Sequence, residues 1–313
     1  MLELGPAVVE ARVLGLAEEC RRVVIVDGDR GYHVGRLAVA VAAYLSEQRY
    51  GRSLCFDVQG EAAMALTNAA RCCSRLYEAR IALQMAERFL ENGSGDVLLR
   101  FRLANDRSSL VRALGYHQEA LRTYEAGLRM ARESPVLSQR DSGNLGFRVK
   151  RAIFVAELDA ARGLQLQRPL LGQLREQGLS WLTYCAHTSI VDCLLNTGSY
   201  EEAHQELRRV ERDHSLFAST RHNMTVLRQR TAVLRALGRF DEAWAILEEL
   251  HRNLETSTPT LESTHITAEL AAMAFGLGRK MRARRYAAEA VSLYTWMGAG
   301  FLARQTGTLL ARH

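Results

Sequence analysis

The stretch Gly198-Ser199-Tyr200-Glu201-Glu202-Ala203 returns forty residues later as Gly238-Arg239-Phe240-Asp241-Glu242-Ala243. Gly278–Ala283 repeats the same Gly and Ala after a further forty residues, and Gly115–Ala120 lies two periods before Gly198–Ala203. A weaker copy, Ser74–Ala79, precedes Ala120 by 41 residues. A spacing of this size that persists along the chain is typical of an array of stacked repeats.

Each copy predicts a hinge between two antiparallel helices. In the copy at Gly238, the pattern predicts one helix over 222–237 and a second over 240–254. Glycine reaches the left-handed conformation that commonly follows the last turn of a helix. The acids Asp241 and Glu242 suit the positive end of the next helix, and Ala243 lets the two helices approach closely.

Two regions fit the pattern less well. Between Ala120 and Ala203 we expect helices over 147–164 and 169–177, with a hinge at 162–165 and an irregular insertion over 133–144. At the N-terminus we expect a helical pair over 6–26 and 32–48 around the turn 27–31, although Val23-Val24-Ile25-Val26 also fits a β-strand.

The sequence therefore divides into three predicted parts. Residues 1–56 form a degenerate first repeat, 57–295 form the main helical repeats, and 296–313 contain a capping helix over 299–312. A terminal helix of this kind shields the last apolar face of an array. The predicted fold class is all-α, a right-handed superhelical solenoid of about six to seven antiparallel helix pairs.

Composition excludes several classes of protein. The 313 residues carry a net charge of +6, and only Lys150 and Lys280 among the 41 basic residues are lysines. Because acidic residues are interspersed, this charge fits a solvated surface better than a nucleic-acid stripe. The six cysteines include no Cys-x-x-Cys pair, so we expect buried thiols and no metal. No membrane span or signal peptide is recognisable, which favours the cytoplasm.

Motifs of reaction chemistry are not recognisable in the sequence. It contains no glycine-rich nucleotide loop, metalloprotease motif or nucleophile elbow. The loop Asn92–Asp96 is best interpreted as a helix stop followed by an Asp96 N-cap, and Asp27–Asp29 as a turn with too few ligands for calcium. We therefore expect neither catalysis nor a cofactor.

The hinges resemble those of the tetratricopeptide repeat (TPR), which read Gly-x-aromatic-x-x-Ala between antiparallel helices. The match is good at Gly198–Ala203 and Gly238–Ala243, while Tyr116 lies one position early and Lys280 replaces the aromatic residue in the last copy. The period near 40 exceeds the usual 34 of the family and is similar to that of the longer helical repeats of bacterial signal-responsive regulators.

This resemblance implies a concave groove lined by the first helix of each pair. Polar residues occupy many of the implied groove positions, with asparagines suited to peptide backbones and arginines suited to carboxylates. The candidate groove residues are Asn68, Arg71, Arg102, Asn105, Asp106, Arg112, Ser189, Asp192, Asn196, Arg228, Gln229, Arg235, His265 and Glu269.

The resulting hypothesis is a non-catalytic scaffold that binds a protein or peptide, with an acidic segment as the natural ligand, in a bacterial regulatory sensor or adaptor. The alternative is a nucleic-acid-binding protein that uses arginines along its helices. Self-association is also left open. No helix-turn-helix segment is recognisable, so any effect on transcription would pass through a partner.

Overall fold

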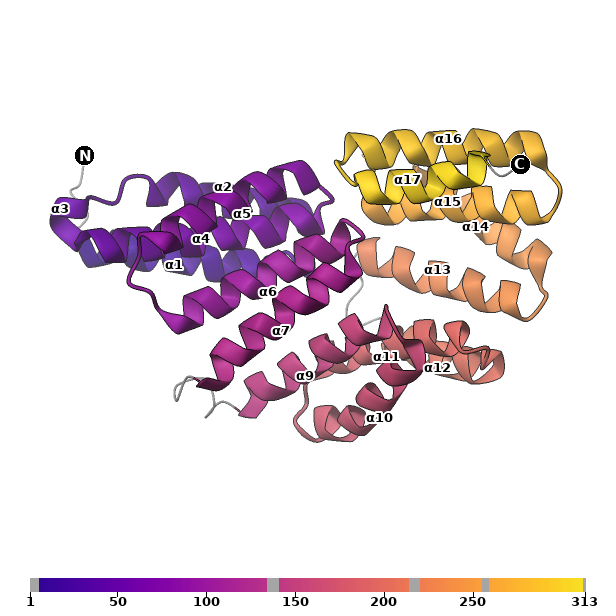
Figure 1. The fold of residues 1–313 in the computed structure, drawn as a ribbon, viewed down its shortest axis with the longest axis horizontal. Helices are drawn as coiled ribbons and strands as arrows, with labels where there is room; N and C mark the ends of the chain where they lie inside the picture. The colour runs from indigo at the N-terminus through magenta and orange to yellow at the C-terminus, as the bar shows by residue number, and fades with distance from the viewer. Residues whose placement is uncertain (1–5, 134–140, 214–219, 255–258, 312–313) are drawn as a thin grey trace. The chain divides into compact units, whose positions relative to one another are not determined.

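Helices and the turns between them make up the described part of the chain. The structure, a computed structural model, describes residues 6–133, 141–213, 220–254 and 259–311, and no strand occurs in these ranges (Figure 1). None of the helices described is long and apolar enough to cross a membrane. The chain divides into two compact units, Met1–Arg140 and Asp141–His313.

The first unit is a stack of helix pairs. Its pairs are α1 with α2, α4 with α5 and α6 with α7, and a short α3 joins the first pair to the second. The first helices of the last two pairs, α4 and α6, also pack on one another. The bounds are α1 Pro6–Val23, α2 Gly28–Ala42, α3 Glu47–Tyr50, α4 Arg52–Cys72, α5 Leu76–Glu91, α6 Val97–Ala113 and α7 His117–Glu133.

The second unit continues the same plan through four pairs and a final helix. The first helices α9, α11, α13 and α15 pack in sequence on one another, each against its own second helix. The bounds are α9 Asp141–Ala156, α10 Ala160–Glu176, α11 Ser180–Asn196, α12 Tyr200–Asp213, α13 Thr220–Ala236, α14 Phe240–Leu254, α15 Leu261–Gly276, α16 Lys280–Trp296 and α17 Gly300–Ala311.

The predicted hinges join antiparallel helices. Gly115, Gly198, Gly238 and Gly278 have φ of 91°, 77°, 77° and 71°. At Gly238 the chain closes a Schellman motif, in which the Arg239 N–H donates to Leu234 O at 2.9 Å and the Gly238 N–H to Arg235 O at 3.1 Å. The weaker copy forms the same motif with Ser74, whose φ is 60°. The period therefore marks the hinges correctly.

The prediction for the pair before α11 was wrong. We expected a hinge at 162–165, yet α10 runs through it from Ala160 to Glu176 and also contains Pro169. The turn instead ends at Asp159, whose side chain accepts a hydrogen bond from the Arg162 N–H at 2.9 Å. Gly163 occupies the position that alanine has in the other repeats, where the two helices of a pair approach closely (the close-packing position). A Cβ at Gly163 would lie only 2.4 Å from the Ala156 Cβ.

The N-terminal region is helical, with boundaries shifted from those expected. Residues 24–26 form a turn rather than a strand, and α2 begins at Gly28 behind an Asp27 N-cap. Asp96 caps α6 as predicted, accepting hydrogen bonds from the Leu98 and Leu99 N–H groups at 2.6 and 3.3 Å. Of the insertion expected over 133–144, residues 134–140 lie outside the described residues, whereas 141–144 belong to α9. The predicted terminal helix is α17.

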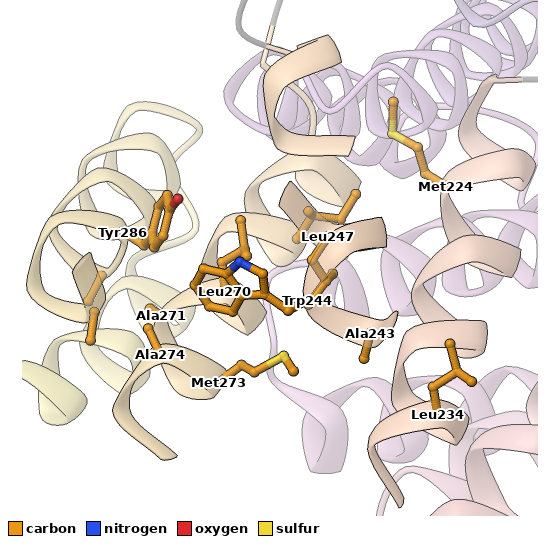
Figure 2. Close-up of a cluster of buried hydrophobic side chains, with 13 residues drawn as sticks. Met224, Leu234, Ala243, Trp244, Leu247, Leu270, Ala271, Met273, Ala274 and Tyr286 are labelled. Carbon is orange, nitrogen blue, oxygen red and sulfur yellow. The ribbon is translucent and has the colours of Figure 1, made fainter. Parts of the chain in front are cut away.

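Small residues allow the helices of each pair to pack closely. Ala79, Ala120, Ala203, Ala243 and Ala283, which occupy the repeated position, have no exposed surface. Larger side chains fill the remaining space in each layer. Figure 2 shows one such cluster, in which Trp244 and Leu247 of α14 lie with Leu270 and Met273 of α15. This packed core holds the first helices in parallel order and so fixes which polar side chains meet.

Candidate binding face

Polar side chains from α11, α13 and α15 meet on one face of the second unit. We call Ser189, Asp192, Arg228, Gln229, His265 and Glu269 the polar row, and all six are candidates from the sequence. Successive first helices pack on one another, and the residues of each helix are three or four positions apart or adjacent. A spacing of three or four places Ser189 with Asp192, and His265 with Glu269, on one side of their helices. The adjacent Arg228 and Gln229 diverge and contact α15 and α11.

Gln229 ties α13 to α11. Its Nε2 donates to Thr188 O at 2.7 Å and to Asp192 Oδ1 at 3.0 Å. The side chain is almost completely buried, and its Oε1 has no hydrogen-bond partner among the described residues. A buried amide oxygen without a donor is unfavourable, so a ligand or water that displaced the neighbouring atoms and donated to it would be stabilised.

Arg228 ties α13 to α15. Its Nη1 lies 3.4 Å from Glu269 Oε1, a long ion pair whose side chains keep 32% and 21% of their surface exposed. Burial alone would lower the pKa of Arg228, but the charges of Asp192 and Glu269 outweigh it and raise the pKa. Burial raises the pKa of Glu269 despite the opposing charges of Arg228 and Arg235. The row is therefore both desolvated and accessible.

His265 links the row to α16. Its Nδ1 lies 2.5 Å from the Tyr294 hydroxyl on α16. Burial lowers the pKa of His265 to about 4, and the positive charge of Arg228 acts in the same direction. The imidazole is accordingly uncharged at neutral pH, and the charged groups that act on it are Arg228 and, in the opposite direction, Glu262.

Ser189, within the row, contacts the second helix α10, whereas the other two candidates of this unit, Asn196 and Arg235, lie outside the row. Ser189 accepts a hydrogen bond from Gln167 Nε2 at 2.9 Å. Asn196 is the exposed last residue of α11. Arg235 is exposed, although its charge reaches Glu269. Sequence reasoning missed Gln167 and Tyr294, because both come from second helices that the groove hypothesis did not consider.

A comparable set of polar contacts occurs in the first unit. Glu61, which is 4% exposed, accepts a hydrogen bond from Arg102 Nη1 at 2.5 Å and lies 3.0 Å from Arg21 Nη2. Its Oε2 has no hydrogen-bond partner among the residues described. Arg102 is therefore neutralised by a carboxylate of the preceding repeat. The contribution of Arg21, on α1, carried no sequence signal.

The remaining candidates of the first unit form local contacts. Arg71 Nη2 donates to Asn68 Oδ1 at 2.7 Å within α4. Asn105 Nδ2 lies 3.4 Å from Asp106 Oδ1 on α6. Arg112 is half-buried near the end of the same helix. These residues lie on α4 and α6, which pack on one another.

A second polar cluster of the second unit is structural. His187, 1% exposed, lies between α10 and α12, with Nε2 3.1 Å from Arg175 Nη2 and Nδ1 bonded to Glu206. Arginine can only donate, so Nε2 accepts and Nδ1–H donates to Glu206. Burial would raise the pKa of Glu206, but the bonds from His187 and Arg209 lower it. His187 is therefore held by Arg175 and Glu206, apart from the polar row.

A surface hollow of the second unit lies apart from the candidate residues. A hollow of about 500 Å³ lies on α12, lined by Gln205, Arg208, Arg209, Glu211 and Arg212, and none of the candidate residues lines it. Across the described ranges, no group of three or more His, Cys, Asp or Glu is placed to hold a metal ion.

Comparisons with solved structures place this arrangement among known folds. The chain is similar to NprR in complex with its cognate peptide NprX, with a TM-score of 0.66, 13% identity, and coverage of 95% of this chain and 82% of that one. It is also similar to a Rap protein complexed with competence and sporulation factor, with a TM-score of 0.69, 10% identity, and coverage of 94% and 80%. The fold is a TPR-like helical solenoid.

A further similar structure is the apo form of the quorum sensor NprR from B. thuringiensis, with a TM-score of 0.56, 14% identity, and coverage of 94% of this chain and 81% of that one. No protein-family model matches the sequence, and no curated protein does either. At these identities the similarity concerns the fold. It agrees with the predicted resemblance to the repeats of bacterial signal-responsive regulators.

Proposed function

We propose that this protein is a non-catalytic regulatory sensor or adaptor that binds a peptide, or an extended segment of a protein, on the polar row of α11, α13 and α15. The observation that carries the proposal is the combination of burial and access in the row. Gln229 holds an unsatisfied acceptor, and the Arg228–Glu269 pair is long and partly exposed. A peptide backbone offers the N–H and C=O groups that such side chains bind.

The similar solved structures support this choice, because NprR is in complex with its cognate peptide and the Rap protein with competence and sporulation factor. The charges of the row restrict the class of ligand that we expect. Arg228 and Arg235 are balanced by Asp192 and Glu269, so the row has no net excess of positive charge. An acidic ligand therefore has less support than a peptide bound mainly through its backbone.

Nucleic-acid binding is the alternative function, and the described contacts do not favour it. Arg102 and Arg228, two of the arginines proposed to face a ligand, lie against Glu61 and Glu269. Phosphate binding would require these pairs to separate. Binding that weakens steeply with rising salt on an RNA or DNA column would support this alternative.

A phage-displayed library of random peptides tests the proposal with purified protein. We expect the wild type to enrich a common sequence motif and Arg228→Ala combined with Arg235→Ala to lose it. Arg230→Ala is the matched control, because Arg230 lies on the same helix but pairs with Glu211 at 2.9 Å, away from the row. The control should enrich the same motif as the wild type.

Helicity measured by circular dichroism must be equal in all three proteins for the comparison to count. A wild type that enriches no motif, or a double variant that enriches the same one, would contradict the proposed function. Affinity purification followed by mass spectrometry, with the same three proteins, then identifies the natural partner.

A further inference from the structure

The first half of α16 carries a concentration of positive charge. Five of the residues from 279 to 285 are basic and exposed, and together we call them the α16 basic surface: Arg279, Lys280, Arg282, Arg284 and Arg285. The second helices of the two preceding pairs begin differently. α12 starts with Glu201 and Glu202, and α14 starts with Asp241 and Glu242. The last repeat therefore carries basic residues at the start of its second helix, where the two preceding repeats carry acidic residues.

Helix stability does not explain this replacement. The first turn of a helix has a partial positive charge, which favours acids and disfavours bases. α16 has no acid in its first turn, and Arg279 at the N-cap makes no capping hydrogen bond with its side chain. Lys280 and Arg282 therefore lie in the first turn, where a positive charge weakens the helix, and this points to a role outside it.

Contacts within the chain use only part of the charge. Arg282 Nη1 lies 3.3 Å from Glu248 Oε1, with both side chains substantially exposed. The Arg279 guanidinium lies 4.5 Å from the centre of the Trp244 ring. The side chains of Lys280 and Arg285 make no hydrogen bond or ion pair within the described ranges. Their charges are available to a partner.

Apolar side chains accompany the basic ones. Met281, between Lys280 and Arg282, is 78% exposed, and Leu277 and Phe240 at the neighbouring hinges are 38% and 44% exposed. A phosphate backbone would use the cations and leave the methionine in water. An acidic protein segment with apolar side chains would use both. Exposed apolar surface rimmed by polar groups is typical of protein-binding sites.

We propose that the α16 basic surface, with Met281 at its centre, docks an acidic segment of another protein that also carries apolar side chains. The surface shares no residue with the polar row. It therefore gives the protein a second interaction, independent of the peptide proposed above. Arginine is suited to this role because its guanidinium binds carboxylates in a bidentate manner.

The test uses a fluorescein-labelled synthetic helical peptide with glutamates along one face and leucines along the other, and measures fluorescence anisotropy. Lys280→Glu combined with Arg285→Glu should weaken binding at least tenfold. Because acids suit the start of a helix, the single variant Lys280→Glu should unfold at the same temperature as the wild type or higher, so its own several-fold loss of binding cannot be ascribed to misfolding. Met281→Ser should weaken binding several-fold.

The matched control is Arg80→Glu combined with Arg88→Glu, which makes the same change of charge at two exposed positions of α5. It should bind the peptide as the wild type does, and so should Arg228→Ala with Arg235→Ala. Undiminished binding by the α16 variant, or an equal loss in the α5 control, would overturn the proposal. So would tighter binding of duplex DNA or anionic vesicles than of the peptide, lost in the α16 variant.

Discussion

Single residues determine the hinges of this array through backbone conformation. Gly238 has a φ of 77°, and a Cβ there would meet no other atom within 4 Å. Replacing Gly238 by alanine would therefore destabilise the protein through backbone conformation and not through a steric clash. The similar φ of Ser74 indicates that the hydrogen bonds of the Schellman motif can hold an ordinary residue in this conformation.

Gly238→Ala should lower the free energy of unfolding by about 1–2 kcal/mol, because alanine is strained in the left-handed region. Gly172→Ala is the matched control, since Gly172 is an exposed residue inside α10 with equal space around it. It should raise the free energy by about 0.5–1 kcal/mol through helix propensity. Urea unfolding followed by tryptophan fluorescence measures both, because Trp181, Trp244 and Trp296 all lie in the second unit. Equal effects of the two changes would refute the hinge assignment.

At the scale of helix pairs, the first pair of each unit is joined by a turn that differs from the repeated glycine hinge. These are the turns between α1 and α2 and between α9 and α10. The sequences Asp27-Gly28-Asp29-Arg30-Gly31 and Asp159-Ala160-Ala161-Arg162-Gly163 share Asp-x-x-Arg-Gly. In both, the aspartate accepts a hydrogen bond from the arginine N–H. In both, the final glycine meets the end of the preceding helix or the turn just after it, at Ala156 and at Val24 respectively. The glycine is needed for close approach and not for a positive φ.

Gly163→Ala should lower the free energy of unfolding by about 1–3 kcal/mol. The added Cβ would lie 2.4 Å from the Ala156 Cβ and 2.6 Å from its Cα, so α9 and α10 must move apart. Gly146→Ala is the control on α9, where the new Cβ would meet Leu182 Cδ1 at an ordinary 3.6 Å. The same fluorescence assay applies. A neutral Gly163→Ala would mean that the two helices are not in contact there.

The sequence predicted the helix pairs well because the hinge and the close-packing position leave a strong signal. The prediction from the sequence failed at Gly163 because a glycine can serve either as a hinge residue or as a residue of close helix packing. The spacing distinguishes them: Gly163 precedes Ala203 by one period of 40, and so occupies the alanine position. A hinge residue at that spacing would be Leu158, which does not have a positive φ.

The polar contacts follow the same period but were harder to predict. Glu61 with Arg102, Thr188 with Gln229, and Arg228 with Glu269 are each 41 residues apart. Equivalent positions of successive repeats therefore bind one another. We interpreted Arg102, Arg228, Gln229 and Glu269 individually as ligand contacts, because sequence does not reveal whether a polar side chain faces a ligand or the next repeat. The contacts from second helices, such as Tyr294, carry no comparable spacing.

At the scale of the whole molecule, the charge on the row couples stability to pH through His265. Folding lowers the pKa of His265 from 6.5 to about 4. Between these values the unfolded chain binds a proton at this site that the folded chain does not. Stability from this group is therefore unchanged above pH 6.5 and falls as the pH drops towards 4. The raised pKa of Glu269 acts in the opposite direction, because the folded state favours its protonated form.

Replacing His265 separates its contribution to the pH dependence of stability from that of Glu269. Between pH 7 and pH 5 the wild type should lose about 2 kcal/mol more than His265→Asn, as a shift of this size implies. Tryptophan fluorescence in urea at the two pH values measures the difference within the second unit. His204→Asn is the control, since His204 is on α12 with no row residue as a partner, and should keep the loss seen in the wild type. If wild type and His265→Asn respond to pH alike, His265 is hydrated, and the row is too open to hold a neutral imidazole beside Arg228.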